Sequence, residues 1–131
     1  MWPSPAGALA PVAGSRDPVE RVAFACGFLL RGVHAYQGAV RAMIAATITH
    51  PELAPIRPGL RFGLIDEALA PVTGALMGAD PAGLAQLKHD LAAVVSAEAL
   101  FVLTDLAGLT PDNAIASLIR TATTITRAAF R

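Results

Sequence analysis

Apolar residues recur along this chain every three or four positions, which is the spacing of one face of an α-helix. The first run opens at Asp17, a favourable N-cap that is followed by proline, and it predicts a helix ending near residues 32–35. A break around residues 34–38 would separate this helix from a second one. The second helix should stop at His50, because the next residue is a proline.

Proline and glycine divide the middle of the chain. Three prolines between residues 51 and 58 predict a surface loop in which helix is improbable. Helical spacing resumes at Phe62 and continues past an internal Pro71, which should kink the helix or interrupt its hydrogen bonds. This third helix should end by Gly78.

A fourth helix starts after Asp80, and no breaker is recognised before Gly108. The pattern predicts a single helix of about 26 residues, roughly 39 Å long at 1.5 Å per residue. Between Leu91 and Leu103 it is apolar on nearly all sides, so it must be covered both by its own domain and by something else.

The clearest local signal is the junction at Gly108. Glycine suits the left-handed position after a helix, Thr110 is a good N-cap, and the proline and Asp112 that follow suit a first helical turn. The last helix should span residues 111–129. The long helix and the last helix are therefore expected to form an antiparallel hairpin.

These elements predict an all-α fold, an antiparallel domain of about five helices over residues 17–131, after a flexible leader at residues 1–16 without packed structure. Hydrophobic residues make up 54% of the chain, which indicates a second buried surface. We expect the last two helices to pair with those of a second copy as a four-helix bundle. The residues expected in this dimer interface are Val95, Ala99, Val102, Leu106, Leu118, Ala122 and Ile125.

Charge and composition exclude several classes of function. The net charge is zero and the ten basic residues are scattered, so this chain alone is not expected to bind DNA. No uninterrupted apolar run reaches about 18 residues, and no signal peptide is recognised, so no membrane partner and a cytoplasmic location are expected. The abundance of alanine and of arginine over lysine is typical of a GC-rich bacterium.

No catalytic or metal motif is present, and no cofactor is expected. The single Cys26 lies in an apolar run and is expected to be a small buried residue. The three histidines, His34, His50 and His89, have no ligand spacing that would indicate a metal site. We therefore expect a protein that is not an enzyme.

A drug-sized ligand needs bulky apolar side chains around it, although each such side chain is more often simply part of a core. The residues expected to contact a ligand are Phe28, Tyr36, Met43, Phe62, Glu98, Phe101 and Asp105. The two carboxylates, Glu98 and Asp105, share the apolar line of the long helix, so each needs a partner. They either face a ligand cavity, cap nearby backbone groups, or pair with an arginine such as Arg41 or Arg120.

Two stretches resemble the C-terminal half of tetracycline-repressor (TetR) family transcription regulators. One is Glu-Ala-Leu-Phe-Val-Leu-Thr-Asp-Leu-Ala-Gly-Leu-Thr-Pro-Asp at residues 98–112, and the other is Arg-Phe-Gly-Leu-Ile-Asp-Glu-Ala-Leu-Ala-Pro at residues 61–71. The resemblance covers residues 19–131. It implies an all-helical homodimer in which the last two helices pair and the remaining C-terminal helices enclose a pocket for a small apolar or amphipathic effector.

The resemblance leaves out the DNA-binding head of that family, an N-terminal helix-turn-helix domain, because nothing before Asp17 supplies a recognition helix. Three interpretations stay open: a misplaced gene start, a fragment, or a free module. The functional expectation is an effector-sensing and dimerisation domain of a transcription regulator. The alternative is a helical interaction module that dimerises without a ligand.

Overall fold

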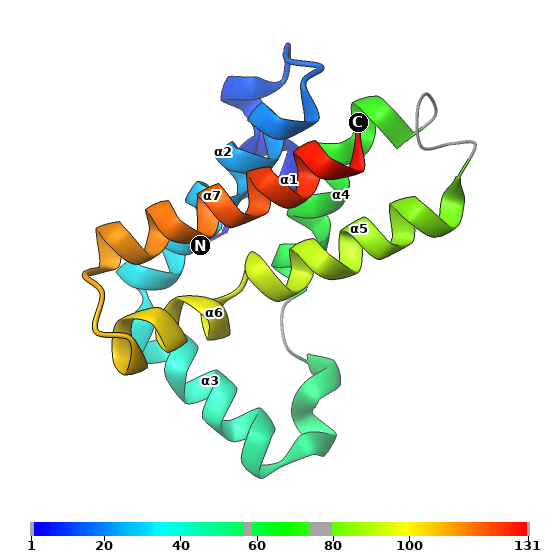
Figure 1. Cartoon of the computed structure of the whole chain (residues 1–131). Helices are drawn as coiled ribbons and strands as arrows, with labels where there is room; N and C mark the ends of the chain where they lie inside the picture. Colours follow the sequence, from blue (N-terminus) through cyan, green and yellow to red (C-terminus); the bar gives the residue numbers. More distant parts are fainter. Residues whose placement is uncertain (1, 57–58, 74–79, 131) are drawn as a thin grey trace.

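The computed structural model describes residues 2–56, 59–73 and 80–130, and over these ranges it is helical without any strand, as predicted (Figure 1). Its α-helices are α1 (Pro5–Ala8), α2 (Pro18–Ala35), α3 (Gln37–Thr49), α4 (Leu60–Thr73), α5 (Pro81–Val94), α6 (Ala97–Phe101) and α7 (Pro111–Ala129). Two 3₁₀ turns, η1 (Ala10–Val12) and η2 (Pro51–Ile56), and a π-helical turn, η3 (Val102–Leu106), complete the described elements.

Helix α2 is the centre of the fold. It packs against α7 on one side and α4 on the other, and α5 closes the core by contacting both α4 and α7. Leucines supply most of the filling, and the most deeply buried of them are Leu9, Leu30, Leu64, Leu69, Leu91 and Leu100. Removing such side chains from water is the main force that holds the helices together, at about 25 cal/mol per Å² of apolar surface.

Three predicted helix starts are confirmed, each with the expected cap. The side chains of Asp17, Asp80 and Thr110 accept hydrogen bonds from backbone N–H groups two or three residues ahead, and each is followed by proline. Gly108 has a φ of 74°, which confirms the left-handed position, and α7 has the predicted bounds. The predicted break after α2 is also confirmed, because Tyr36 has a φ of −114° and a ψ of 29°.

The prediction of an unpacked leader at residues 1–16 is wrong. This segment contains α1 and η1, and it buries Ala8, Leu9 and Val12 in the common core. The buried guanidinium of Arg21 reinforces the contact by donating to the carbonyls of Val12 and Ser15 at 2.9 and 3.3 Å. The leader packs because its few apolar side chains meet α2 and α4, a long-range contact that local composition does not reveal.

The single long helix predicted between Asp80 and Gly108 is also wrong. Helix α5 stops at Val94, Val95 forms a tight turn in which the Ser96 N–H donates to the Val94 carbonyl at 3.0 Å, and Ser96 then caps α6. The chain continues into the π-helical turn η3 before it reaches Gly108. The connection from α5 to α7 therefore holds two further elements, whereas the predicted hairpin had one tight turn.

Helix α3 and the turn η2 project from the body of the molecule (Figure 1). They pack mainly against each other, where Thr47 is buried. Helix α3 stops at Thr49 as predicted, but residues 51–56 form a 3₁₀ turn instead of the expected loop. Pro71 lies inside α4 as predicted, and the predicted helix end by Gly78 falls outside the described residues.

None of the helices described here combines the length and the apolar character that crossing a membrane would require.

Candidate functional site

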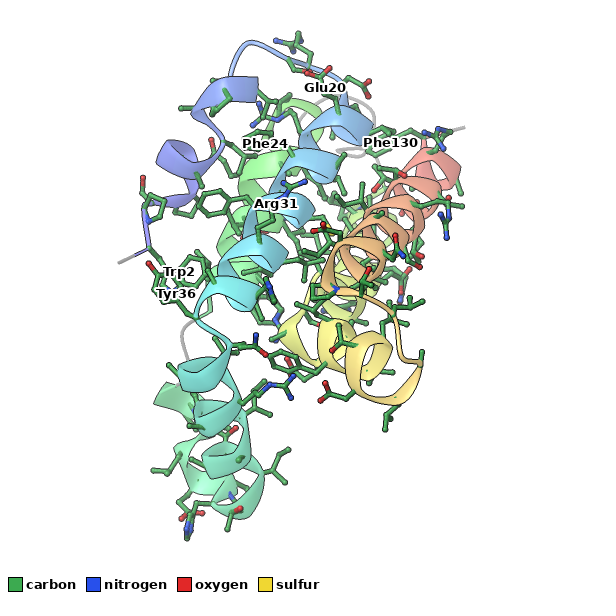
Figure 2. All side chains as sticks on the ribbon, turned by 90° about the vertical axis from the view of Figure 1, so that its left-hand side faces the viewer. Trp2, Glu20, Phe24, Arg31, Tyr36 and Phe130 are labelled. Carbon is green, nitrogen blue, oxygen red and sulfur yellow. The ribbon has the colours of Figure 1, made fainter. Side chains whose placement is uncertain are left out.

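A groove lies on the surface of α2, and we call it the aromatic groove. Its lining residues are Trp2, Pro3, Phe24, Phe28, Arg31, Gly32 and Tyr36, and its volume is about 490 Å³. It thus contains four of the seven aromatic residues of the chain. Figure 2 shows this side of the molecule, with Trp2 and Tyr36 together beside α2.

The indole of Trp2 is the centre of the aromatic groove. Its ring centroid lies 6.4 Å from that of Phe28 and 6.0 Å from that of Tyr36, with interplanar angles of 64° in both pairs. Edge-to-face contacts of this kind are favourable because the positive edge of one ring meets the negative face of another. The three rings therefore hold one another in a defined arrangement.

The sequence builds the groove by two local devices. Phe24, Phe28 and Tyr36 are separated by multiples of four residues, which places them along one face of α2. Gly32 lies on the same face, and a Cβ atom at this position would clash with the Trp2 indole. The absence of that side chain lets the segment before α1 lie close against the helix.

Arg31 gives the aromatic groove its only charged side chain. Its guanidinium folds back over Gly27, where an added Cβ would come within 2.6 Å of Nη1 and 3.4 Å of the Ile119 methyl group. Arg31 forms no ion pair with any residue that the structure describes. It therefore offers a guanidinium without a competing carboxylate.

A second, smaller cavity lies behind Trp2, between α2, α3, α4 and α6. It measures about 70 Å³, and its lining residues are Trp2, Leu29, Val33, Val40, Met43, Leu60, Arg61 and Ala97. Arg61 donates to the Ala92 carbonyl at 3.2 Å and to the Glu98 carboxylate at 2.7 Å. Trp2 lines both this cavity and the aromatic groove.

A third cluster joins α3 to η3. Arg41 donates two hydrogen bonds to the Asp105 carboxylate, and its guanidinium carbon lies 3.8 Å from the centre of the Phe101 ring. The hydrogen bonds from Arg41 lower the pKa of Asp105, and the same bonds raise the pKa of Arg41. The adjoining cleft measures only about 140 Å³.

The seven residues predicted to contact a ligand do not form one site. Phe28 and Tyr36 line the aromatic groove, Met43 lines the small cavity, and Phe101 and Asp105 line the third cleft. Glu98 is engaged by Arg61, and Phe62, 56% exposed, lines none of these three hollows. Helix α5 ends at Val94, so Glu98, Phe101 and Asp105 lie on α6 and η3 and not on one long helix.

The alternative interpretation of the two carboxylates, pairing with arginine, is confirmed. Asp105 pairs with Arg41, one of the two arginines named for this role. Glu98 pairs with Arg61 instead, and the structure shows no bond from Arg120 to either acid.

Trp2, Phe24 and Arg31 line the groove but are not among the seven residues predicted to contact a ligand. Trp2 is the only tryptophan of the chain, and Arg31 interrupts the aromatic face of α2. Both residues stand out in the sequence. The position of Trp2 could not be predicted from it, because that position depends on the leader packing against α2.

The predicted dimer interface divides into two groups. Val95, Leu118 and Ala122 are buried in the core of this single chain, and their place in a dimer interface stays a prediction. Ala99 and Ile125 are half-buried, whereas Val102 and Leu106 are exposed on η3. Val95 follows the end of α5, whereas Ala99 lies on α6 and Val102 and Leu106 lie on η3, so these four residues do not share one continuous helix face.

The chemistry of the remaining candidates is limited. Cys26 is fully buried as predicted, and this burial raises the pKa of its thiol to about 12. Within residues 2–56, 59–73 and 80–130, no three side chains among His, Cys, Asp and Glu come together as metal ligands would.

The fold and the groove define a small all-helical protein with an aromatic surface groove. Comparisons with models of known families, with curated proteins and with solved structures find no match to this chain.

Proposed function

We propose that this chain is an effector-sensing domain of the kind that the TetR-like stretches imply, and that its effector is a small aromatic or amphipathic molecule held in the aromatic groove. The observation that carries the proposal is the gathering of Trp2, Phe24, Phe28 and Tyr36 around one hollow. The all-helical fold and the Gly108 turn are in keeping with the resemblance.

Size and lining together favour the aromatic groove over the other hollows. Small-molecule sites usually measure about 300–1,000 Å³, and the groove falls in this range whereas the cavity beside Arg61 and the cleft beside Arg41 do not. A hollow of about 470 Å³ between α5 and α7 also falls in this range, but no aromatic side chain lines it. A ring inserted beside Trp2 would also gain an aromatic contact, worth about 0.5–1.5 kcal/mol beyond its buried area.

The position of Tyr36 suggests how an effector would be sensed. Tyr36 lines the groove, and it is also the residue at which α2 ends and α3 begins. A ligand that contacts Tyr36 differently in two orientations of α3 would shift the population between them. Helix α3 projects from the body, so its orientation would be the output of binding (Figure 1).

The test uses Trp2 as a reporter, since it is the only tryptophan. N-phenyl-1-naphthylamine, an uncharged aromatic probe, is titrated while energy transfer from Trp2 is measured. We expect saturable transfer and a higher melting temperature, because a ligand that binds only the native state stabilises it.

Two variants locate the probe. Tyr36→Ala should weaken binding about fivefold, the equivalent of one aromatic contact of about 1 kcal/mol. Phe62→Ala is the matched control, because Phe62 is 56% exposed and Tyr36 is 50% exposed, but only Tyr36 lines the groove. Absence of saturable transfer, or equal weakening by both variants, would overturn the proposal.

The alternative is a dimerisation module that binds no ligand, and one observation favours it. Leu106 is 83% exposed and Val102 is 52% exposed, side by side on η3, an uncommon position for large apolar residues. A second copy would cover them. Light scattering at micromolar concentration should then give the mass of a dimer. Leu106→Asp should reduce this mass to that of a monomer, whereas Thr121→Asp, on the exposed face of α7, should leave it unchanged. A monomeric mass for the wild type would remove this alternative.

A further inference from the structure

We infer that the aromatic groove selects planar aromatic molecules that carry an anionic group, a carboxylate or sulfonate, and that Arg31 is the residue that binds this group. The inference rests on the proposed function, since it names the chemical class of the ligand for the same groove.

Charge is the first argument. Arg31 is the only ionisable side chain among the groove residues apart from the Tyr36 phenol, and no carboxylate lines the hollow. Every described ion pair of the chain uses Arg21, Arg41, His50, Arg61 or Lys88 as its basic member. A ligand anion at Arg31 therefore displaces no internal partner, and an anionic ligand meets no repelling carboxylate in the lining.

The order of side chains around α2 is the second argument. At 3.6 residues per turn, Arg31 lies about 60° to one side of Phe28, and Gly32 lies about 40° to the other side. Trp2 covers Gly32, so the ring of Phe28 forms a floor between an indole wall and a cationic wall. In Figure 2, Arg31 lies over α2 and Trp2 lies beside the helix.

The setting of the guanidinium is the third argument. Arg31 lies against the bare backbone of Gly27 and near Ile119 of α7, in a space that any larger residue at position 27 would occupy. The side chain therefore runs along α2 toward Gly27, and the residue is exposed to solvent. A guanidinium presents its planar N–H donors to a carboxylate or sulfonate in a paired geometry that lysine does not reproduce.

The ligand that satisfies all three features has a planar ring and an acid. Its ring lies over Phe28 beside Trp2, and its anionic group accepts hydrogen bonds from Arg31. Aromatic carboxylates and sulfonates belong to this class, whereas uncharged aromatics fill only the apolar part of the groove.

Two probes that share one aromatic framework test the inference. The first is 8-anilinonaphthalene-1-sulfonate, and the second is N-phenyl-1-naphthylamine, the same framework without the sulfonate. Binding of each is measured by energy transfer from Trp2 in the wild type, in Arg31→Gln and in Arg127→Gln. Arg127 is the matched control, because it is an exposed arginine on α7 that lines none of the hollows described above.

We expect Arg31→Gln to weaken the sulfonate probe about tenfold, the effect of one charge-assisted hydrogen-bond pair, and to leave the uncharged probe unchanged. Arg31→Lys should bind the sulfonate probe more tightly than Arg31→Gln does, but less tightly than the wild type. Arg127→Gln should change the affinity for neither probe. The affinity of the sulfonate probe should also fall as salt is added.

The outcomes separate the two proposals. If the uncharged probe binds and is weakened by Tyr36→Ala, but the sulfonate probe is unaffected by Arg31→Gln, the groove binds aromatics without selecting anions and the inference fails alone. Equal weakening of both probes by Arg31→Gln leads to the same conclusion. If neither probe binds the wild type, the proposed function fails and the inference fails with it.

Discussion

Arg41 and Asp105 form a two-point ion pair that joins the projecting helix α3 to the π-helical turn η3. The Nη1–Oδ2 distance is 2.7 Å and the Nη2–Oδ1 distance is 3.0 Å. The Arg41 guanidinium also lies over the Phe101 ring, so one side chain makes a polar and an aromatic contact. Because α3 packs on the body through few other contacts, this pair is the main candidate for controlling its orientation.

The first prediction concerns Asp105→Asn. The pKa of Asp105 is lowered below its ordinary value of 3.8, so the pair stabilises the folded state above that pH, and its contribution is lost as the pH falls through the lowered pKa. We expect faster amide hydrogen exchange in α3 of the variant at neutral pH, with little change in melting temperature because the pair is exposed. The difference from the wild type should disappear in acid below the lowered pKa. An exchange difference that persists there would contradict the assignment.

The helix boundaries that could be predicted are those set by neighbouring residues. Asp17, Asp80 and Thr110 cap their helices by bonding to N–H groups within three residues, and Gly108 adopts its φ locally. Such interactions join residues that are close in the sequence, so a short stretch is enough to predict them. The all-helical class follows from the same local signals and from the helical spacing of apolar residues.

The aromatic groove could not be predicted in the same way, because it depends on contacts between distant residues. Trp2 meets Phe28 and Tyr36 only because the leader crosses α2 at Gly32. Nothing in residues 1–16 has a helical period that would indicate this path. The pairings Arg61–Glu98 and Arg41–Asp105 are likewise set by how α3, α4, α6 and η3 meet in space.

The second prediction tests the close approach at Gly32. Ala in a helix is favoured over Gly by about 1 kcal/mol, but a Cβ at position 32 would displace the Trp2 indole. We expect Gly32→Ala to shift Trp2 fluorescence to the red, to weaken the aromatic probe and to gain no stability. Gly38→Ala is the control, because nothing lies within 4 Å of a Cβ there, and it should stabilise α3 without changing the fluorescence. Identical spectra for the two variants would show that Trp2 does not lie on Gly32.

The third prediction concerns Cys26, which is fully buried and whose thiol pKa is raised to about 12. At pH 8, roughly one thiol in ten thousand would then be ionised, and the thiolate is the reactive form. We expect the native protein to react with a thiol reagent only as fast as it opens, and to react at once in urea. Rapid labelling of the native protein would contradict the burial.

The fourth prediction addresses the break that the apolar pattern hid. Helical spacing continues from Leu91 through Phe101, so the apolar pattern predicts no interruption at Ser96. The Ser96 hydroxyl accepts from the Ala99 N–H at 3.1 Å and donates to the Ala93 carbonyl at 3.0 Å, in a site that is 2% exposed. Ser96→Ala should cost about 1–2 kcal/mol of unfolding free energy, measured by urea denaturation. An unchanged or higher stability would mean that one continuous helix is accessible at no cost.

The fifth prediction concerns Arg21, whose buried guanidinium ties the leader and α4 to α2. Besides Val12 and Ser15, it donates to the carbonyls of Glu67 and Ala68 at 2.6 and 2.9 Å. Arg21→Met keeps much of the apolar stem but leaves these carbonyls without their donor. We expect a loss of about 2–4 kcal/mol in urea denaturation, from buried polar groups that stay unpaired.

The same variant should also loosen the leader, because two of the four carbonyls belong to it. A red shift of Trp2 fluorescence at urea concentrations below the global transition would report this loosening. Arg16→Met, at an exposed position of the same segment, serves as the control and should change neither quantity. If Arg21→Met lowers global stability without any separate change at Trp2, the leader is held by its apolar residues alone, and the groove wall does not depend on Arg21.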